Sequence, residues 1–571
     1  MLEVADRAGL ARIVNWTING SKALLPNILF HSSEIFSSPP YAEMLISPTE
    51  SHLNVIMDEE VLFEIEDDIN PPLSYQRRRS IEDIDRSIII RDKIGKSSSQ
   101  SGELFVLNNA FELRRDARKF VESVKLLREY IGYNKLIYAP GIMEPSNISL
   151  LIYMGIDLFD SSQLIYQGSR GRILLPEGVF NASDSEKYPT SQDIIRHNLD
   201  AAWKELKLAR YMIRIGRLRE LVESRAHSTP WGVAALRLLD HDYYDYQEKY
   251  TPVVGPSFYA NTKMALLRPD VRRFRQRILE RWAPAAHKKI LLLIPCSAKK
   301  PYYTSKSHRI LKEVLLSVPN SCSVQELIIT SPLGAVPREL ELFYPAAQYD
   351  IPVTGHWDCE ERSIVKELIT HAASFDFNKV INHLGDDGKL TSGVVNSIYT
   401  ADGGSTSNDS LESLREALLS ACGEVDKVPR AHDRIEMLRS VARYQFGSEA
   451  GILLDDATVV GKYPYVKIME GKTQRAMLTP DRGMLSLTLD GAEKLLNHGI
   501  GWVEMGDFDL VGSLFSVGVQ AADPTIRPGD EVVLLRNNEI EGVGVAIMSG
   551  AEMADSQRGE AVKVRHKRRR K

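Results

Sequence analysis

The sequence is poor in cysteine: its 571 residues include only four, at positions 296, 322, 359 and 422. None belongs to a Cys-x-x-Cys pair, so we predict neither a disulfide framework nor a cysteine-rich zinc site, and we expect a reducing compartment. No other metal site is predicted. No apolar run approaches the roughly 18 residues of a membrane span, and the first residues lack the basic-then-apolar pattern of a secretory signal. We therefore expect a cytoplasmic protein with no membrane contact and no cofactor.

An overall basic excess is also missing. The formal charge is −5, with 43% hydrophobic and 26% charged residues. At roughly 100 to 200 residues a domain, the length predicts about three to five soluble globular domains. Positive charge is densest at the C-terminal end, which either binds phosphate or is a solvated end. The candidate RNA-binding residues there are Lys563, Arg565, Lys567, Arg568, Arg569, Arg570 and Lys571.

Reactive groups gather where one apolar run ends. Residues 290–294 are continuously apolar, which is typical of a strand buried on both faces of an α/β sheet, and such sheets bind ligands at the carboxyl ends of their strands. Cys296 would lie at that edge. Lys299, Lys300 and His308 are near enough in sequence to lower the pKa of its thiol. The alternative is that Cys296 is a small buried side chain and the lysines are solvated.

Periodicity organises the remaining chain. Helical spacing over residues 111–131, a strand at 135–139, a strand at 155–160 and a charged helix over 192–226 follow the rhythm of an α/β barrel. A further strand is expected at 379–384, and helices at 410–421 and 431–446. We predict an α/β multidomain protein with four domains, at residues 1–265, 286–400, 411–457 and 458–571.

The N-terminal part resembles tRNA-guanine transglycosylases. Val4-x-x-Arg7-x-Gly9-Leu10-Ala11-Arg12 is similar to the start of that family, and Gly155-Ile-Asp-Leu-Phe-Asp160-Ser-Ser to its nucleophile strand. The resemblance implies a barrel in which the carboxylate matching Asp160 attacks ribose during base exchange. The family's Ser-Gly-Gly-Phe-Gln loop is missing between Ala42 and Glu60, as is its zinc site. We therefore expect a degenerate transglycosylase-like barrel, in which Asp160 has lost the catalytic role and keeps a structural one.

The C-terminal 110 residues or so resemble the PUA domain, a small RNA-binding β-barrel. The similar segments are Lys467-Ile-Met-Glu-Gly471, Gly501-Trp-Val-Glu-Met-Gly506, Ala522-Asp-Pro-Thr-Ile-Arg-Pro-Gly-Asp530, Glu541-Gly-Val-Gly-Val-Ala546 and Arg558-Gly-Glu-Ala-Val562. The basic end of the chain would add contacts to the RNA backbone, which give affinity with little sequence information.

The central part resembles archaeosine synthases. Its motif is Pro295-Cys-x3-Lys300-Pro-Tyr302-x2-Ser305-x2-His308, and similarity continues through residues 331–341 and 344–361. The resemblance implies an archaeal tRNA-modifying transferase that adds the side-chain amine of free lysine to the nitrile of 7-cyano-7-deazaguanine at position 15 of tRNA. A separate radical SAM enzyme would then cleave the adduct. Glutamine or ammonia is the alternative nitrogen donor.

The motif residues suit this chemistry. A Cys296 thiolate can add to a nitrile and give a thioimidate, which an amine displaces. His308 or Tyr302 could protonate the nitrile nitrogen, Lys300 could lower the thiol pKa, and Ser305 belongs to the same motif. Direct attack by the amine, with Cys296 only packing against the base, stays open.

A free amino acid also has to be held. Arg338 is the candidate for its carboxylate, and Asp358, Glu361 and Asp386 are candidates for its ammonium groups, although each could be an ordinary surface charge. Two rival classes remain, a true transglycosylase and a noncatalytic tRNA-binding subunit. The oligomeric state is open, a homodimer included.

Overall fold

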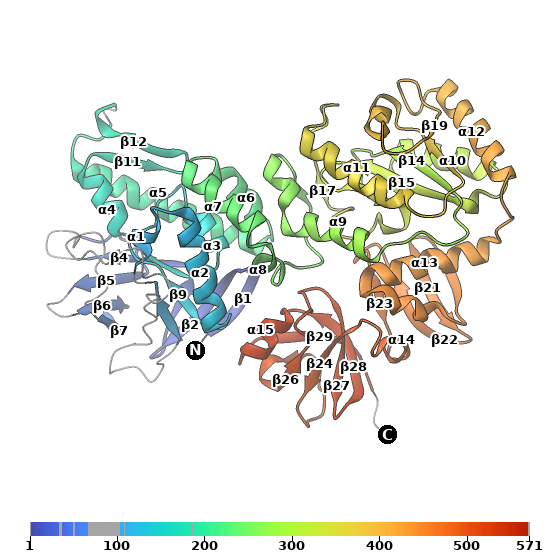
Figure 1. The fold of residues 1–571 in the computed structure, drawn as a ribbon. Helices are drawn as coiled ribbons and strands as arrows, with labels where there is room; N and C mark the ends of the chain where they lie inside the picture. The colour runs from blue at the N-terminus through green and yellow to red at the C-terminus, as the bar shows by residue number, and fades with distance from the viewer. Residues whose placement is uncertain are drawn as a thin grey trace. The chain divides into compact units, whose positions relative to one another are not determined.

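The computed structural model describes residues 2–32, 37–48, 52–66, 103–107, 109–184 and 187–568. Internal contacts divide the chain into two compact units (Figure 1). The first comprises Met1–Thr251, Phe515–Val519 and Met548–Ala561. The second comprises Pro252–Leu514, Gln520–Ile547 and Val562–Lys571. The four predicted domain boundaries stay predictions.

The first unit contains a seven-stranded sheet. Five neighbouring strands pair in parallel, and the last two strands at one edge are joined to them and to each other by antiparallel pairing. The predicted α/β rhythm is therefore present in a reduced form. The strand order is β7 (Glu60–Glu66), β6 (His52–Met57), β5 (Met44–Pro48), β4 (Asn27–His31), β10 (Leu158–Asp160), β9 (Leu136–Tyr138) and β8 (Leu104–Val106). An antiparallel sheet precedes it, made of β1 (Leu2–Ala8), β2 (Ala11–Ile18) and β3 (Ser21–Leu25).

Two predicted helices of this unit are broken. In place of the single helix expected over 111–131 there are two helices, α1 (Ala110–Leu113) and α2 (Ala117–Ile131). The Asp116 carboxylate caps the start of α2 by accepting from the amides of Arg118 and Lys119. The helix expected over 192–226 is α5 (Ser191–Arg214) and α6 (Leu218–Ala226), because Gly216 has a φ of +69°, which ends a helix. The other elements are α3 (Ile148–Tyr153), α4 (Ser162–Ser169), β11 (Arg172–Leu175), β12 (Gly178–Asn181), α7 (Pro230–His241) and α8 (Tyr244–Glu248).

The second unit is built on a five-stranded sheet with β14 (Ile290–Pro295) in the middle. The strand order is β16 (Gly334–Pro337), β15 (Val324–Thr330), β14, β18 (Lys379–Asn382) and β19 (Ile398–Tyr399), and only β16 is antiparallel. The expected strands at 290–294 and 379–384 are confirmed. A short parallel pair, β13 (Phe258–Tyr259) and β17 (Tyr349–Asp350), lies outside this sheet. Its helices are α9 (Pro269–Arg281), α10 (Lys306–Ser317), α11 (Cys359–Ala373), α12 (Asn408–Gly423) and α13 (Arg430–Phe446).

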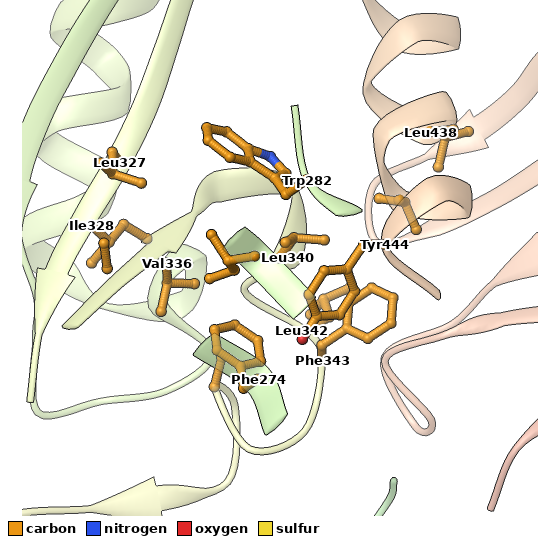
Figure 2. Close-up of a cluster of buried hydrophobic side chains, with 14 of the residues drawn as sticks. Phe274, Trp282, Leu327, Ile328, Val336, Leu340, Leu342, Phe343, Leu438 and Tyr444 are labelled. Carbon is orange, nitrogen blue, oxygen red and sulfur yellow. The ribbon is translucent and has the colours of Figure 1, made fainter. Parts of the chain in front are cut away.

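A buried apolar cluster joins this sheet to α13. Figure 2 shows Tyr444 of α13 beside Phe343 and Phe274, with ring centroids 4.9 Å and 5.6 Å away. Leu340 and Leu342, both on the segment that follows β16, are fully buried in the same cluster. Burial of this size stabilises by roughly 1.5 to 3 kcal/mol for each large apolar side chain. Because Leu340 and Leu342 are buried in this cluster, they anchor the segment that carries Arg338.

Two β-sheets form the C-terminal part. The first contains β20 (Thr458–Lys462), β21 (Tyr465–Glu470), β22 (Thr473–Leu478) and β23 (Leu485–Leu487), followed by α14 (Leu489–Leu495). The second has the order β25 (Leu514–Phe515), β29 (Glu560–Lys567), β28 (Glu539–Ala546), β27 (Glu531–Arg536), β24 (Gly501–Met505) and β26 (Val519–Ala522), with α15 (Gly550–Asp555) before β29. Across the described ranges, no helix has the length and apolar character needed to cross a bilayer.

The basic C-terminal end differs from a simple solvated tail. Lys563 to Lys567 belong to β29 and pair with β28, where Lys563 faces Val545 and Lys567 faces Gly542. Much of the cationic segment is therefore part of a sheet.

Candidate active site

Cys296 lies at the carboxyl end of the central strand. Its amide donates to the Ile329 carbonyl at 3.1 Å, which extends the β14–β15 ladder by one residue. Thr330, the next residue of β15, hydrogen-bonds the Cys296 thiol. Burial raises the pKa of that thiol, whereas the Thr330 bond and the Lys300 charge act to lower it. The side chain is a partly buried thiol with one hydroxyl and one cation beside it.

Three hydroxyl groups form a chain that ends at this thiol. The Tyr302 hydroxyl lies 2.7 Å from the Tyr349 hydroxyl, which lies 2.5 Å from Thr330 Oγ1. All three residues are buried. Burial raises the pKa of Tyr302 and of Tyr349, so both phenols keep their protons at neutral pH. A proton can pass along this chain without a charged tyrosinate.

Lys300 is held beside the same tyrosine. Its Nζ lies 4.1 Å from the centroid of the Tyr349 ring, a cation–π distance, and 3.4 Å from the Ala298 carbonyl. Burial lowers the pKa of Lys300, while Cys296 and Asp350 raise it. The amine therefore exchanges a proton more readily than an exposed lysine.

His308 and Ser305 are held by the protein's own groups. The imidazole stacks on the Tyr302 ring with centroids 5.3 Å apart, and its Nδ1 accepts from the Arg338 guanidinium at 2.8 Å. Burial and the Arg338 charge lower the pKa of His308 to about 3. The Ser305 hydroxyl caps α10 by accepting from the His308 amide at 3.2 Å. At neutral pH His308 is uncharged and Ser305 is a helix cap, and their catalytic roles stay predictions.

Arg338 is engaged in a partly buried ion network. Its guanidinium contacts Glu326 at 2.6 Å and Glu341 at 3.1 Å in addition to His308. Glu341, whose side chain is fully buried, also accepts from the Tyr463 hydroxyl at 3.1 Å. A cavity of about 390 Å³ lies against this network, and its lining includes His308 and Arg338 but not Cys296. The predicted binding of a donor carboxylate by Arg338 would have to compete with two carboxylates already in place.

The predicted ammonium-binding carboxylates lie in two places. Asp358 and Glu361 form a capping box at the start of α11, and Glu361 also accepts from the Ser331 hydroxyl at 2.6 Å. Asp386 is exposed. Its neighbour Asp387 is partly buried and accepts from the Trp357 indole at 2.9 Å. Burial raises the pKa of Asp387, and the charge of this carboxylate acts to raise the pKa of the Cys296 thiol.

Sequence reasoning missed Thr330, Tyr349 and Asp387. Thr330 could have been found, because parallel strands of one sheet bring their carboxyl ends together and Thr330 ends the next strand after β14. Tyr349 lies within the similar segment 344–361 and Asp387 follows the candidate Asp386, but neither stands out in the linear sequence. Nothing in the linear sequence shows that a short strand such as β17 returns the Tyr349 hydroxyl to Thr330.

Asp160 is enclosed in the first unit. Its side chain is fully buried and accepts from the Tyr138 hydroxyl at 2.9 Å, the Gly141 amide at 2.8 Å and the Ser162 amide at 2.8 Å, and the Ser162 hydroxyl donates to it as well. The carboxylate ties β10 to β9 and to the start of α4. This geometry suits the expected structural role.

Several cations of the basic end bond to other groups of the protein. Arg565 pairs with the buried Glu531, the Lys567 amine donates to the Leu510 carbonyl at 3.1 Å, and Arg568 pairs with Glu539 at 3.2 Å. Lys563 is exposed. Arg569, Arg570 and Lys571 lie outside the described residues. RNA binding by this set stays a prediction.

Comparisons with known proteins cover most of the chain. Family models match as Queuine tRNA-ribosyltransferase at residues 91–193, a domain of unknown function (DUF5591) at 271–418, the patch-forming domain C2 of tRNA-guanine transglycosylase at 436–498 and the PUA domain at 510–568. The mixed α/β fold with a transglycosylase-like domain and a C-terminal PUA domain is thereby confirmed.

Curated relatives agree over similar lengths. The chain is 37% identical to the archaeosine synthase subunit alpha of Methanosarcina acetivorans, over 82% of this chain and 80% of the relative. It is 36% identical to the protein of the same name in Thermococcus kodakarensis, over 80% of each chain. The archaeosine synthase of Haloferax volcanii is 32% identical, over 81% of this chain and 82% of the relative. The chain belongs to the archaeosine synthase family.

Proposed function

We propose that this protein modifies tRNA in archaeosine biosynthesis by adding the side-chain amine of free lysine to the nitrile of 7-cyano-7-deazaguanine at position 15. Family membership and the PUA domain support the tRNA substrate and a transferase activity. The observation that carries the chemistry is the position of Cys296, at the carboxyl end of the central strand with Thr330 and Lys300 beside its thiol.

The proposed reaction has two balanced steps. The Cys296 sulfur bonds to the nitrile carbon, and the thiol proton reaches the nitrile nitrogen, which gives a thioimidate. The lysine amine then adds to the same carbon, the carbon–sulfur bond breaks, and a proton from the amine returns to sulfur. The product is an amidine that contains every atom of both reactants.

The neighbours of Cys296 have roles in these steps. The Lys300 ammonium, whose pKa is lowered by burial, gives a proton to the nitrile nitrogen, and the neutral amine that results takes the proton of the thiol. Thr330, supported by Tyr349, stabilises the sulfur whenever it carries negative charge. Asp387 would accept the proton of the incoming ammonium, since burial favours its protonated form.

Base exchange is disfavoured as an alternative. The carboxylate that would attack ribose, Asp160, is fully buried and accepts four hydrogen bonds. A carboxylate whose lone pairs are committed in this way is a poor nucleophile without rearrangement of its surroundings.

The test uses the purified chain, tRNA that carries 7-cyano-7-deazaguanine, and lysine labelled with nitrogen-15 in its side chain. Nucleoside mass spectrometry should show a gain equal to one whole lysine, with the label in the amidine. A gain equal to ammonia in the presence of glutamine would identify the other donor. No gain with either donor, while tRNA still binds, would leave a noncatalytic tRNA-binding subunit.

A partner enzyme completes the proposed pathway. Two of the relatives are named subunit alpha, which supports a second subunit. An adduct that retains all of lysine needs a later cleavage to release the amidine base, and we assign this step to a radical SAM enzyme that acts on the product.

A further inference from the structure

Helix α5 of the first unit has an exposed face of one charge sign. The exposed side chains between Arg196 and Arg214 are all cationic or aromatic, namely Arg196, Lys204, Lys207, Tyr211 and Arg214. At 3.6 residues per turn these five positions lie within an arc of about 80°, and the stripe is about 27 Å long. We call this set the α5 stripe. Figure 1 shows α5 in the first unit.

The acidic residues of α5 are all used inside the unit. Asp193 forms the capping box with Thr190, and Asp200 accepts from the Tyr41 hydroxyl at 2.6 Å. Glu205 is buried and pairs with Arg225 at 2.9 Å. Asp200 lies within the arc of the stripe, but its side chain is partly buried and bonded to Tyr41, so the helix presents no fully exposed carboxylate between the cations.

Among the described residues, neighbouring elements compensate the stripe only weakly. Asp6 of β1 lies 3.9 Å from Arg214, and both side chains are about half exposed, so this pair contributes little. Glu43 lies near the buried Arg210, outside the stripe. The Lys207 amine lies 5.9 Å from the centroid of the Trp203 ring and stays exposed.

We propose that the α5 stripe is a second RNA-binding surface, which holds the phosphate backbone of tRNA through its four cations and stacks a base on Tyr211. This inference rests on tRNA being the substrate. Charge complementarity favours a polyanion, and the 55% exposed Tyr211 between Lys207 and Arg214 favours RNA over an acidic protein, because an aromatic ring among cations is typical of a stacking platform.

The closing experiment compares two triple variants of equal charge loss. The stripe variant is Lys204→Gln, Lys207→Gln and Arg214→Gln. The control is Arg118→Gln, Lys119→Gln and Lys125→Gln on α2, a helix that also exposes Glu122 and Glu129. Binding of unmodified tRNA is measured across a range of salt concentrations, so the result does not depend on lysine transfer. Thermal melting confirms that both variants fold.

The stripe variant should flatten the slope of log affinity against log salt by about 2 to 3, since each lost phosphate contact removes roughly 0.7 to 0.9. The control should leave the slope unchanged. Tyr211→Leu should weaken binding at least about fivefold at every salt concentration, whereas Tyr211→Phe should not. A stripe slope equal to that of the control overturns the proposal. Failure of lysine transfer alone would contradict only the proposed function.

Discussion

The Arg338 guanidinium donates to His308 Nδ1 at 2.8 Å and keeps the imidazole neutral. An imidazole that accepts on one nitrogen from a cation cannot bind a second proton there without losing that bond. Burial and this charge lower the pKa of His308 to about 3, from an ordinary value near 6.5.

This relationship predicts how stability depends on pH. Between about pH 6.5 and pH 3 the unfolded chain binds a proton at His308 that the folded chain does not, so the free energy of unfolding falls as the pH falls. The stabilisation is complete above pH 6.5, and about 1 to 2 kcal/mol of it should be lost by pH 5. Urea unfolding of the protein and of His308→Gln at pH 7 and pH 5 measures this, and an equal loss in both would contradict the prediction.

Replacing the proposed nucleophile should separate chemistry from RNA binding. Cys296→Ala should abolish modification of nitrile-bearing tRNA, because no other thiol adjoins Thr330 and Lys300 in the described ranges. Affinity for tRNA should change by less than about 1 kcal/mol, the usual effect of a substitution outside the contacts. Cys359→Ala, at the exposed start of α11, is the matched control. Turnover in Cys296→Ala would favour direct attack by the amine.

Loss of the Thr330 hydroxyl should make the thiol less acidic. Thr330→Val keeps the shape of the side chain but removes the hydrogen bond that lowers the pKa of Cys296, so this pKa should rise. The rate of alkylation of Cys296 near pH 8 should fall, as measured by peptide mass spectrometry. Cys322 and Cys359 in the same sample serve as internal references, and equal slowing at all three would indicate a general effect.

Much of the fold followed from local patterns in the sequence. The apolar run at 290–294 predicted a buried strand, and the motif that follows placed Cys296 at its end, because strand geometry depends on adjacent residues. The break at Gly216 was missed, since a glycine within a periodic pattern ends a helix only when its backbone has a positive φ. The partners of Cys296 were largely missed, because Tyr349 and Asp387 reach the site through tertiary folding.

Arg565 should contribute to folding more than to RNA binding. Its guanidinium pairs with Glu531, whose side chain is fully buried. Arg565→Gln leaves that carboxylate with Arg482 as its remaining charged partner, so we expect a loss of about 1 to 3 kcal/mol in the free energy of unfolding. Lys563→Gln, on an exposed position of the same strand, should change stability by no more than about 0.5 kcal/mol. Equal effects of the two variants in thermal melting would contradict this division.

The remaining cations of the C-terminal end should act through phosphate charge alone. Removal of residues beyond Val562 would delete five of the eight residues of β29 and disturb its pairing with β28, so the informative truncation ends at Arg568. This change deletes Arg569, Arg570 and Lys571. Each lost phosphate contact should lower the slope of log affinity against log salt by roughly 0.7 to 0.9, with the largest loss of affinity at low salt.

Turnover at saturating tRNA should stay unchanged after this truncation, because the deleted residues carry no group that takes part in the proposed reaction. The two measurements separate the possible roles of the segment. An unaltered salt slope would show that these three cations are solvated and do not touch RNA. A fall in turnover at saturation would show that they position the tRNA for chemistry, since a purely electrostatic contribution to affinity disappears once the enzyme is saturated.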